Sequence, residues 1–410
     1  MKRALAVLGL CILSGCSRAP EPAVESAIDP ELAREIAQIK AIDHHAHPVR
    51  PTAAGEAPDT DYDALPVESL APQSDPVRMR ADSAAVVEAH KLFGGKKPDP
   101  VALLDQLGIE SMFANRVTMG PGLPSPRFLW VPFDDALMYP LSNASLIHNS
   151  DQKAFFEDEE RLLKRYYADL HLASRPATLD GYLLQVVRPT LERQKAGGAV
   201  AIKFEMAYLR AFDIGNPSRD EAEQAWRSGA SGKALQDYTF RFIAREAGRL
   251  GMPVHFHSGA GSGGYFDVAG ANPMLLEPLF DDPALKKTNF VLVHGGWPFS
   301  AQVTALLTKP NVYVDFSSQT LNHAPQEVAS ILRAWLEYVP EKVFFGTDAY
   351  PYSKDMGFAE SAYIATTSGR EALGRALTQM LRDHEISHDR AVELARMVLR
   401  DNARKFYGLP

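Results

Sequence analysis

Two histidines separated by one residue, His45 and His47, are the first residues in the chain whose types and spacing indicate chemistry. They close the short apolar run Ala41-Ile42-Asp43-His44-His45-Ala46-His47. If this run forms a strand, alternate side chains share a face, and Asp43, His45 and His47 point the same way. Two imidazoles on one face could bind a single ion, because histidine is a common protein ligand of zinc.

Three later apolar runs of strand length also end in a histidine or an aspartate. Each is rich in β-branched or aromatic residues and is bounded by Gly, Pro or Asn, which is typical of a buried strand. In a parallel α/β barrel, catalytic groups lie at the C-terminal ends of the strands and converge at one mouth. The pattern therefore predicts one shared metal site. The three runs end at His255 and His257, at His294, and at Asp348.

Strand-like and helix-like segments alternate along the chain, which favours a parallel sheet buried on both faces. We expect an α/β fold, a (β/α)8 TIM-like barrel with insertions after strands one and three. A doubly wound open sheet is the alternative, but it would not readily bring strands one and eight together. The expected strands are 41–46, 110–115, 127–132, 199–204, 253–257, 289–294, 312–316 and 342–348.

The ordered motifs resemble those of the amidohydrolase superfamily, which has H-x-H on strand one, His on strands five and six, and Asp on strand eight. The amidohydrolase-2 (amidohydrolase-related) type is the closest subgroup. Ala207-Tyr208-Leu209-Arg210 is also similar to a segment of fungal FluG-like amidohydrolase domains. The other motifs that carry the resemblance are Phe256-His257-Ser258-Gly259, Val293-His294-Gly295-Gly296, Phe345-Gly346-Thr347-Asp348 and the C-terminal Asn402–Leu409.

The resemblance implies a centre that binds Zn²⁺ or another divalent ion and activates water. Such an ion lowers the pKa of water from about 15.7 to about 7. The implied ligands are His45, His47, His257 and Asp348, and His294 is either a further ligand or a group that polarises the substrate. Asp348 and His294 are the predicted catalytic residues, because the Asp348 carboxylate can take the water proton and return it to the leaving group.

Lys203 decides between one metal ion and two. It closes the apolar run 199–204, where an uncharged and unpaired lysine is costly to bury. In binuclear, phosphotriesterase-like relatives a strand-four lysine is carboxylated and bridges two ions. Lys203 could do the same, or could pair with Asp43, Glu205 or a substrate carboxylate. Glu205 is the other candidate bridge, and if neither residue bridges, the site holds one ion.

Four residues near expected strand ends are the predicted substrate contacts. Arg210 is the best suited of them to a substrate carboxylate, since a guanidinium binds carboxylates through two parallel hydrogen bonds. His255 stands where the family often has Gln, so we expect it to contact substrate or to have a structural role. The set is Arg210, Tyr208, His255 and Trp297.

The N-terminus resembles a bacterial lipoprotein signal. Lys2 and Arg3 precede an apolar segment, 4–13, that is too short for a stable membrane anchor. Leu13-Ser14-Gly15-Cys16 resembles a lipobox that is cut before the cysteine. We expect residues 1–15 to be the signal peptide, 16–28 a tether with a lipid on Cys16, and 29–410 the catalytic domain. Ser17 favours the periplasmic face of the outer membrane in a Gram-negative host.

Composition narrows the functional classes. The only two cysteines, Cys11 and Cys16, both lie in the signal segment, which excludes zinc-finger and cysteine-hydrolase chemistry in the mature domain. The net charge of −8 argues against nucleic acid as a partner. A small-molecule substrate is the expected partner, besides the membrane reached through the lipid, and a homo-oligomer is left open.

Three functions are consistent with these residues. The favoured one is a metal-dependent hydrolase that cleaves an amide, ester or lactone bond with metal-activated water. A mononuclear metal-dependent decarboxylase of the same superfamily is the alternative. A lipoprotein that uses the barrel only for binding is the third, and the complete set of ligand residues argues against it.

Overall fold

The structure is a computed structural model that describes residues 27–52, 55–56, 77, 80–259, 261, 266–353 and 355–410. The predicted signal peptide lies outside these residues, as does the tether except for its last two positions. Cys16 is therefore outside the described residues as well. Most of the long loop expected after strand one also falls outside them.

Eight short strands form two wholly parallel sheets. The first sheet has the order β1-β2-β3 and the second the order β4-β5-β6-β7-β8. Most strand residues are fully buried, as expected for a sheet covered on both faces. The strands are β1 Ala41–Ala46, β2 Ile109–Asn115, β3 Phe128–Val131, β4 Ile202–Phe204, β5 Val254–His257, β6 Phe290–Val293, β7 Val312–Asp315 and β8 Val343–Phe344.

Backbone bridges at both seams join the two sheets into a closed ring. After β3, Phe133 pairs with Lys203 of β4, and the Lys203 N–H donates to the carbonyl of Pro132 at 2.8 Å. After β8, Ala349 pairs in parallel with Ala46 of β1. The eight strands thus follow one another around a TIM barrel, which confirms the expected fold and excludes the open sheet. Strands one and eight are neighbours, as the site requires.

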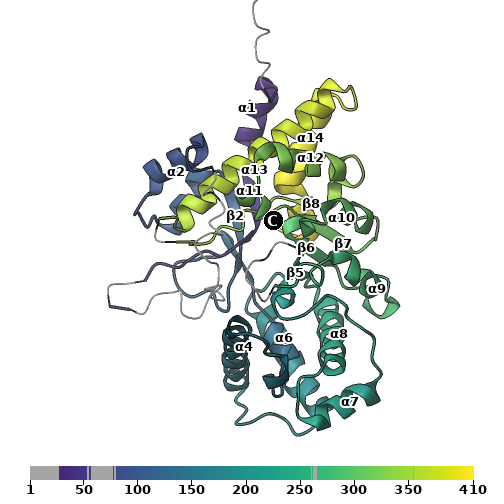
Figure 1. Ribbon diagram of the computed structural model, residues 1–410. Helices are drawn as coiled ribbons and strands as arrows, with labels where there is room; N and C mark the ends of the chain where they lie inside the picture. Colours follow the sequence, from purple (N-terminus) through teal and green to yellow (C-terminus); the bar gives the residue numbers. More distant parts are fainter. Residues whose placement is uncertain are drawn as a thin grey trace, which may run out of the picture.

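Helices surround the barrel (Figure 1). Asp29 caps the first helix, because its side chain accepts from the N–H groups of Glu31 and Leu32. The helices before the insertion and after β8 are α1 Pro30–Gln38, α2 Ala84–Phe93, α3 Pro100–Leu107, α13 Phe358–Arg382, α14 His388–Arg396 and α15 Asn402–Tyr407. The short helices between β5 and β8 are α9 Glu277–Phe280, α10 Ser300–Leu306, α11 Gln319–Asn322 and α12 Pro325–Leu336.

The insertion after β3 and the segment after β4 carry a second group of helices, which gather on one side of the molecule (Figure 1). The polar segment 219–250 forms two helices, because Gly229 adopts a left-handed conformation (φ 78°) that ends the first. The group consists of α4 Ser150–Asp169, α5 Leu179–Tyr182, α6 Arg188–Ala196, α7 Arg219–Ser228 and α8 Lys233–Leu250. Among the described residues, no helix combines the length and the apolar composition needed to cross a membrane.

Candidate metal centre

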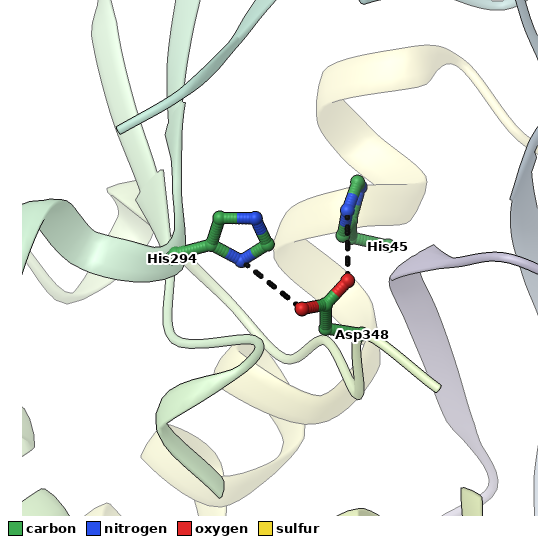
Figure 2. Close-up of side chains that lie close together, drawn as sticks. All are labelled: His45, His294 and Asp348. Atoms are coloured by element: carbon green, nitrogen blue, oxygen red, sulfur yellow. Dashed lines mark ion pairs between the residues drawn. The ribbon is translucent and has the colours of Figure 1, made fainter. Parts of the chain in front are cut away.

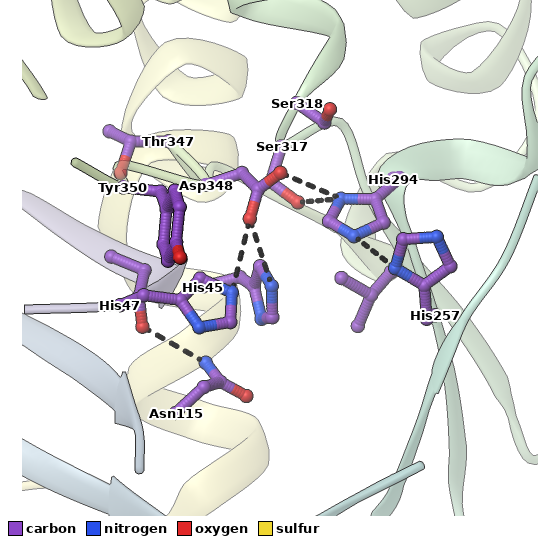
Figure 3. A network of polar contacts seen from close by, with 12 residues as sticks. His45, His47, Asn115, His257, His294, Ser317, Ser318, Thr347, Asp348 and Tyr350 are labelled. Carbon is purple, nitrogen blue, oxygen red and sulfur yellow. Dashed lines mark hydrogen bonds and ion pairs between the residues drawn. The ribbon is translucent and has the colours of Figure 1, made fainter. Parts of the chain in front are cut away.

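The predicted metal ligands meet at one end of the barrel. His45 lies in β1 and His47 directly follows that strand, while His257 closes β5. His294 follows β6 and Asp348 follows β8. All five therefore lie at or just beyond C-terminal strand ends, where the sequence places them, and Figure 3 shows their side chains facing one another.

Asp348 is the centre of a first group of donor atoms. Its Oδ1 lies 3.2 Å from Nε2 of His45 and 3.3 Å from Nε2 of His47. Its Oδ2 lies 3.8 Å from Nδ1 of His294. One donor atom from each of His45, His294 and Asp348 lies within 4.8 Å of the other two (Figure 2).

The side chain of His45 tests whether this group fits a metal ion. It is fully buried, yet neither ring nitrogen has a hydrogen-bond partner among the described residues. The 3.2 Å approach to Asp348 lacks the orientation of a hydrogen bond. An unsatisfied buried nitrogen costs about 1–3 kcal/mol, whereas its lone pair is what a divalent ion binds. The donors therefore fit a divalent ion.

His257 is the centre of a second group. Its Nδ1 lies 3.2 Å from Oε2 of Glu205 and 3.0 Å from Nε2 of His294. The ammonium of Lys203 donates to the other oxygen of Glu205. Of the partners weighed for Lys203, the structure thus shows Glu205. Carboxylation of Lys203, and with it the number of ions, stays a prediction.

Charges within the centre suit a cation. Burial raises the pKa of the Asp348 carboxyl, but His294, His47 and Lys203 outweigh it and hold that pKa well below its usual range. Burial likewise raises the pKa of Glu205, and the charges of Lys203 and His257 more than reverse it. Both carboxylates are therefore ionised at neutral pH.

The pKa values of His45 and His294, the two most buried histidines of the centre, are also lowered, which for an imidazole favours the neutral form. Burial, followed by nearby positive charge, lowers the pKa of His45 well below its usual value. Burial has the same effect on His294, although Asp348 partly opposes it. Neutral imidazoles keep the lone pairs that metal ligands need.

A cavity of about 70 Å³ opens onto the donors. Phe155 reaches it from α4, so the insertion after β3 supplies part of the wall. The ring of Tyr208 lies 4.6 Å from that of His257 and 5.7 Å from that of Phe155. The cavity is lined by His47, Glu205, His257, His294 and Asp348 and by the aromatic residues Phe133, Phe155, Tyr208, Tyr350 and Tyr352.

Arg210, predicted to hold a substrate carboxylate, lies outside the residues that line this cavity. Its Nη1 is 2.6 Å from Oδ1 of Asp237 and 3.0 Å from the Gln236 oxygen. It lines a neighbouring cavity of about 340 Å³, whose wall also includes Tyr208. Trp297 packs against His323, with ring centroids 4.6 Å apart and the ring planes tilted by 49°. Substrate binding by Arg210 and Trp297 stays a prediction.

His255 lies one layer deeper in the barrel than His257. Its Nε2 is 2.7 Å from the hydroxyl of Tyr407, which in turn lies 2.6 Å from Nε2 of His44. The rings of His44 and His255 are 4.7 Å apart. His255 is thus part of a hydrogen-bonded layer beneath the metal centre and does not line the cavity.

Strand β1 departs from the alternation that the sequence suggests. Asp43 does not join His45 and His47 in the group of donor atoms around Asp348. Its carboxylate instead accepts from the N–H and hydroxyl of Thr347, at 2.9 and 2.5 Å. His44 lies among buried barrel residues, next to Asp315 and Tyr407, and the register of β1 against β2 shifts between Asp43 and Ala46.

Sequence reasoning missed Asp315, the last residue of β7. It is fully buried, and its Oδ1 accepts from the N–H of His294 at 2.9 Å. Its Oδ2 lies 2.8 Å from Nδ1 of His44. The sequence does contain an indication of this role. Asp315 closes an apolar strand, as His257 does, and Asp348 follows another.

Comparison with known proteins agrees with this centre. The model of the family described as Amidohydrolase matches residues 152–409, more than half of the chain. The chain therefore belongs to the amidohydrolase family, whose members share a metal-dependent chemistry. Protein fluG of Emericella nidulans is 26% identical over 184 residues, which are 43% of this chain but only 20% of that protein.

Solved structures share the fold at low sequence identity. A Lactobacillus casei protein described as a metal-dependent hydrolase is 17% identical, with a TM-score of 0.65 over 92% of this chain and 97% of its own. Uronate isomerase from Thermotoga maritima is 14% identical, with a TM-score of 0.60 over 93% and 98%. Glucuronate isomerase from Caulobacter crescentus is also 14% identical, with a TM-score of 0.59 over 94% and 96%. One barrel thus serves proteins with different reactions.

Proposed function

We propose that this protein is a zinc-dependent hydrolase that cleaves an amide, ester or lactone bond in a small molecule. The single observation that carries the proposal is His45, a buried imidazole with both nitrogens unpaired among the described residues, next to the ionised Asp348. A divalent ion bound here would acidify a water molecule and polarise a carbonyl group.

The protein's own residues supply the remaining steps. His45, His47, His257 and Asp348 would hold the ion. Asp348 is ionised at neutral pH, so it can accept a proton from water in the cavity and pass it to the leaving group. Five aromatic residues line the cavity, and a less polar wall strengthens the electrostatic interactions beside it.

The test combines metal analysis with a substrate panel. Purified protein is stripped with a chelator, reloaded with Zn²⁺, Mn²⁺ or Co²⁺, and its metal content is measured by elemental analysis. It is then assayed with N-acyl amino acids, dipeptides, lactones and aromatic acids. We expect hydrolysis that is lost on stripping and restored by zinc, and the measured metal content distinguishes one ion from two.

Other outcomes of the panel would replace the proposal. Carbon dioxide release from an aromatic or unsaturated acid, without hydrolysis, would identify a decarboxylase. Tight ligand binding with no product from any class would identify a binding protein. Stable protein that takes up no divalent ion would reject the metal centre itself.

We also propose that the chain is an envelope lipoprotein anchored through Cys16. The proposal is supported by the lipobox Leu13-Ser14-Gly15-Cys16, because Cys16 is its lipid acceptor. In a Gram-negative host, Cys16→Ser should move the protein from the detergent phase to the aqueous phase, or leave it unprocessed. Unchanged detergent partitioning would reject the anchor.

A further inference from the structure

One oxygen of the Asp315 carboxylate receives three hydrogen bonds, from His294 and Ser317. Its Oδ1 accepts from the backbone N–H of His294 at 2.9 Å and from the backbone N–H of Ser317 at 3.0 Å. The same oxygen lies 2.6 Å from the hydroxyl of Ser317, and that hydroxyl lies 2.9 Å from Nδ1 of His294. Figure 3 shows the His294 ring between Ser317 and His257.

These contacts determine where the protons lie. A carboxylate can only accept, so the Ser317 hydroxyl must donate its single hydrogen to Asp315. The 2.6 Å separation is the length of a charge-assisted O–H···O bond. The hydroxyl can then only accept from His294, and Nδ1 of His294 must carry a proton. In a neutral imidazole this leaves a lone pair on Nε2, which faces Nδ1 of His257 at 3.0 Å.

We propose that Asp315 is a positioning residue that, through Ser317, holds the His294 side chain as the tautomer with its proton on Nδ1. The other nitrogen is then available to an ion or to the neighbouring histidine. Metal-bound histidines usually donate their second N–H to a polar partner, which fixes the tautomer and the ring orientation. Asp315 and Ser317 together form such a partner.

The backbone of His294 is held by Asp315 and by Gln319. His294 has a φ of 71°, a left-handed conformation that is uncommon for residues other than glycine. Its N–H donates to Asp315 and its carbonyl accepts from Nε2 of Gln319 at 2.6 Å. At Gly295, which follows, an added Cβ would come within 2.5 Å of the same Gln319 nitrogen. The backbone of His294 is therefore held by Asp315 and Gln319, and its ring is held by Ser317.

The inference deepens the proposed function, but its first test does not depend on hydrolysis. Histidine side chains of the metal-free full-length protein are labelled with ¹⁵N, and the His294 signals are assigned from their loss in His294→Gln. In the wild type we expect a protonated Nδ1 and an unprotonated Nε2. In Ser317→Ala the ring should become a mixture of tautomers, because Nδ1 has lost its acceptor.

Ser258→Ala is the matched control. Ser258 is as buried as Ser317 and donates to a backbone carbonyl, that of Val293 at 2.7 Å. The control removes a hydroxyl of the same kind close to His294, and its His294 tautomer should match the wild type. Circular dichroism and thermal unfolding check that both alanine variants are folded.

Metal affinity is the second readout. Loss of a partner that orients a ligand typically weakens metal binding 10–100-fold, so Ser317→Ala should bind Zn²⁺ about that much more weakly than Ser258→Ala in a chelator competition. A wild-type proton on Nε2, or equal Zn²⁺ affinity in the two variants, would overturn the inference. Failure of hydrolysis with the Nδ1 proton in place would reject only the proposed function.

Discussion

Two layers of histidine and carboxylate lie inside the barrel, and they differ most in the two neighbouring histidines of β1, His44 and His45. The upper layer consists of His45, His47, His257, His294 and Asp348 around the cavity. The lower layer consists of His44, His255, Asp315 and Tyr407, in which the Tyr407 hydroxyl lies within hydrogen-bonding distance of both imidazoles.

His44 and His45 show how two neighbouring buried histidines can have different roles. In the lower layer, His44 has a partner for each ring nitrogen, Asp315 on one side and Tyr407 on the other. In the upper layer, His45 has none within the described part of the chain. The unpaired nitrogens of His45 are available to a ligand, whereas the paired nitrogens of His44 stabilise the fold. The predictions below test this division.

The largest contrast should come from two histidines of β5. His257→Ala, like His45→Ala, should lose bound metal and keep its fold, because its ring belongs to the metal centre. His255→Ala should keep the metal and lose stability, because the Tyr407 hydroxyl would lose a partner. Elemental analysis and thermal unfolding measure the two effects. Equal metal content in the wild type and both upper-layer variants would break the comparison.

Asp348→Asn should keep the barrel and much of the metal and still lose turnover. An amide oxygen can approach an ion but cannot accept the proton of water, and loss of a general base lowers rates about 10²–10⁴-fold. The acidic limb of the pH–rate profile should also disappear in the remaining activity. Near-wild-type turnover with the same acidic limb would show that another group, such as His294 or Glu205, moves the proton.

One buried oxygen of Asp134 has no hydrogen-bond partner among the described residues. A variant of Asp134 can therefore test whether such an oxygen is enough to make a metal ligand. Burial raises its pKa to about 7, partly offset by the hydrogen bond from Gln194. The folded protein holds this proton up to pH 7, whereas the unfolded chain releases it near pH 4. The free energy of unfolding should therefore fall as pH rises from about 4 to 7.

Asp134→Asn should reduce that fall by up to about 4 kcal/mol, since one pKa unit corresponds to about 1.4 kcal/mol. Its metal content should equal that of the wild type, because the side chain lies outside the donor groups. Urea unfolding at several pH values measures the slope. An identical slope, or loss of metal, would contradict this assignment.

Tyr407→Phe should have the smallest effect. It removes the hydroxyl between His44 and His255, and unpaired buried nitrogens cost about 1–3 kcal/mol. Metal content should not change, because the upper layer keeps all of its donors. A variant that keeps wild-type stability but loses metal would show that the two layers act as one.

Much of the fold could be predicted from the sequence because the strands of a barrel are buried on both faces. The expected bounds of β1 are those of the structure, and those of β5 differ by one residue. Two helices begin where Asp precedes Pro, at Asp29 and Asp99, because the Asp side chain caps the helix and Pro suits its first position. The predicted metal ligands could be expected to meet because they occupy equivalent places at or after the ends of several strands.

Only the tertiary structure could decide which nitrogens and carboxylates find partners. Arg210 is held by Asp237 and Lys203 by Glu205, and neither pairing follows from the composition of a strand. The Asp43 carboxylate accepts from the N–H of Thr347, about 300 positions away along the chain, and this pairing too cannot be predicted from the local sequence. Local sequence sets the period and burial of each strand. Contacts between distant strand ends determine which buried polar atoms remain free to bind.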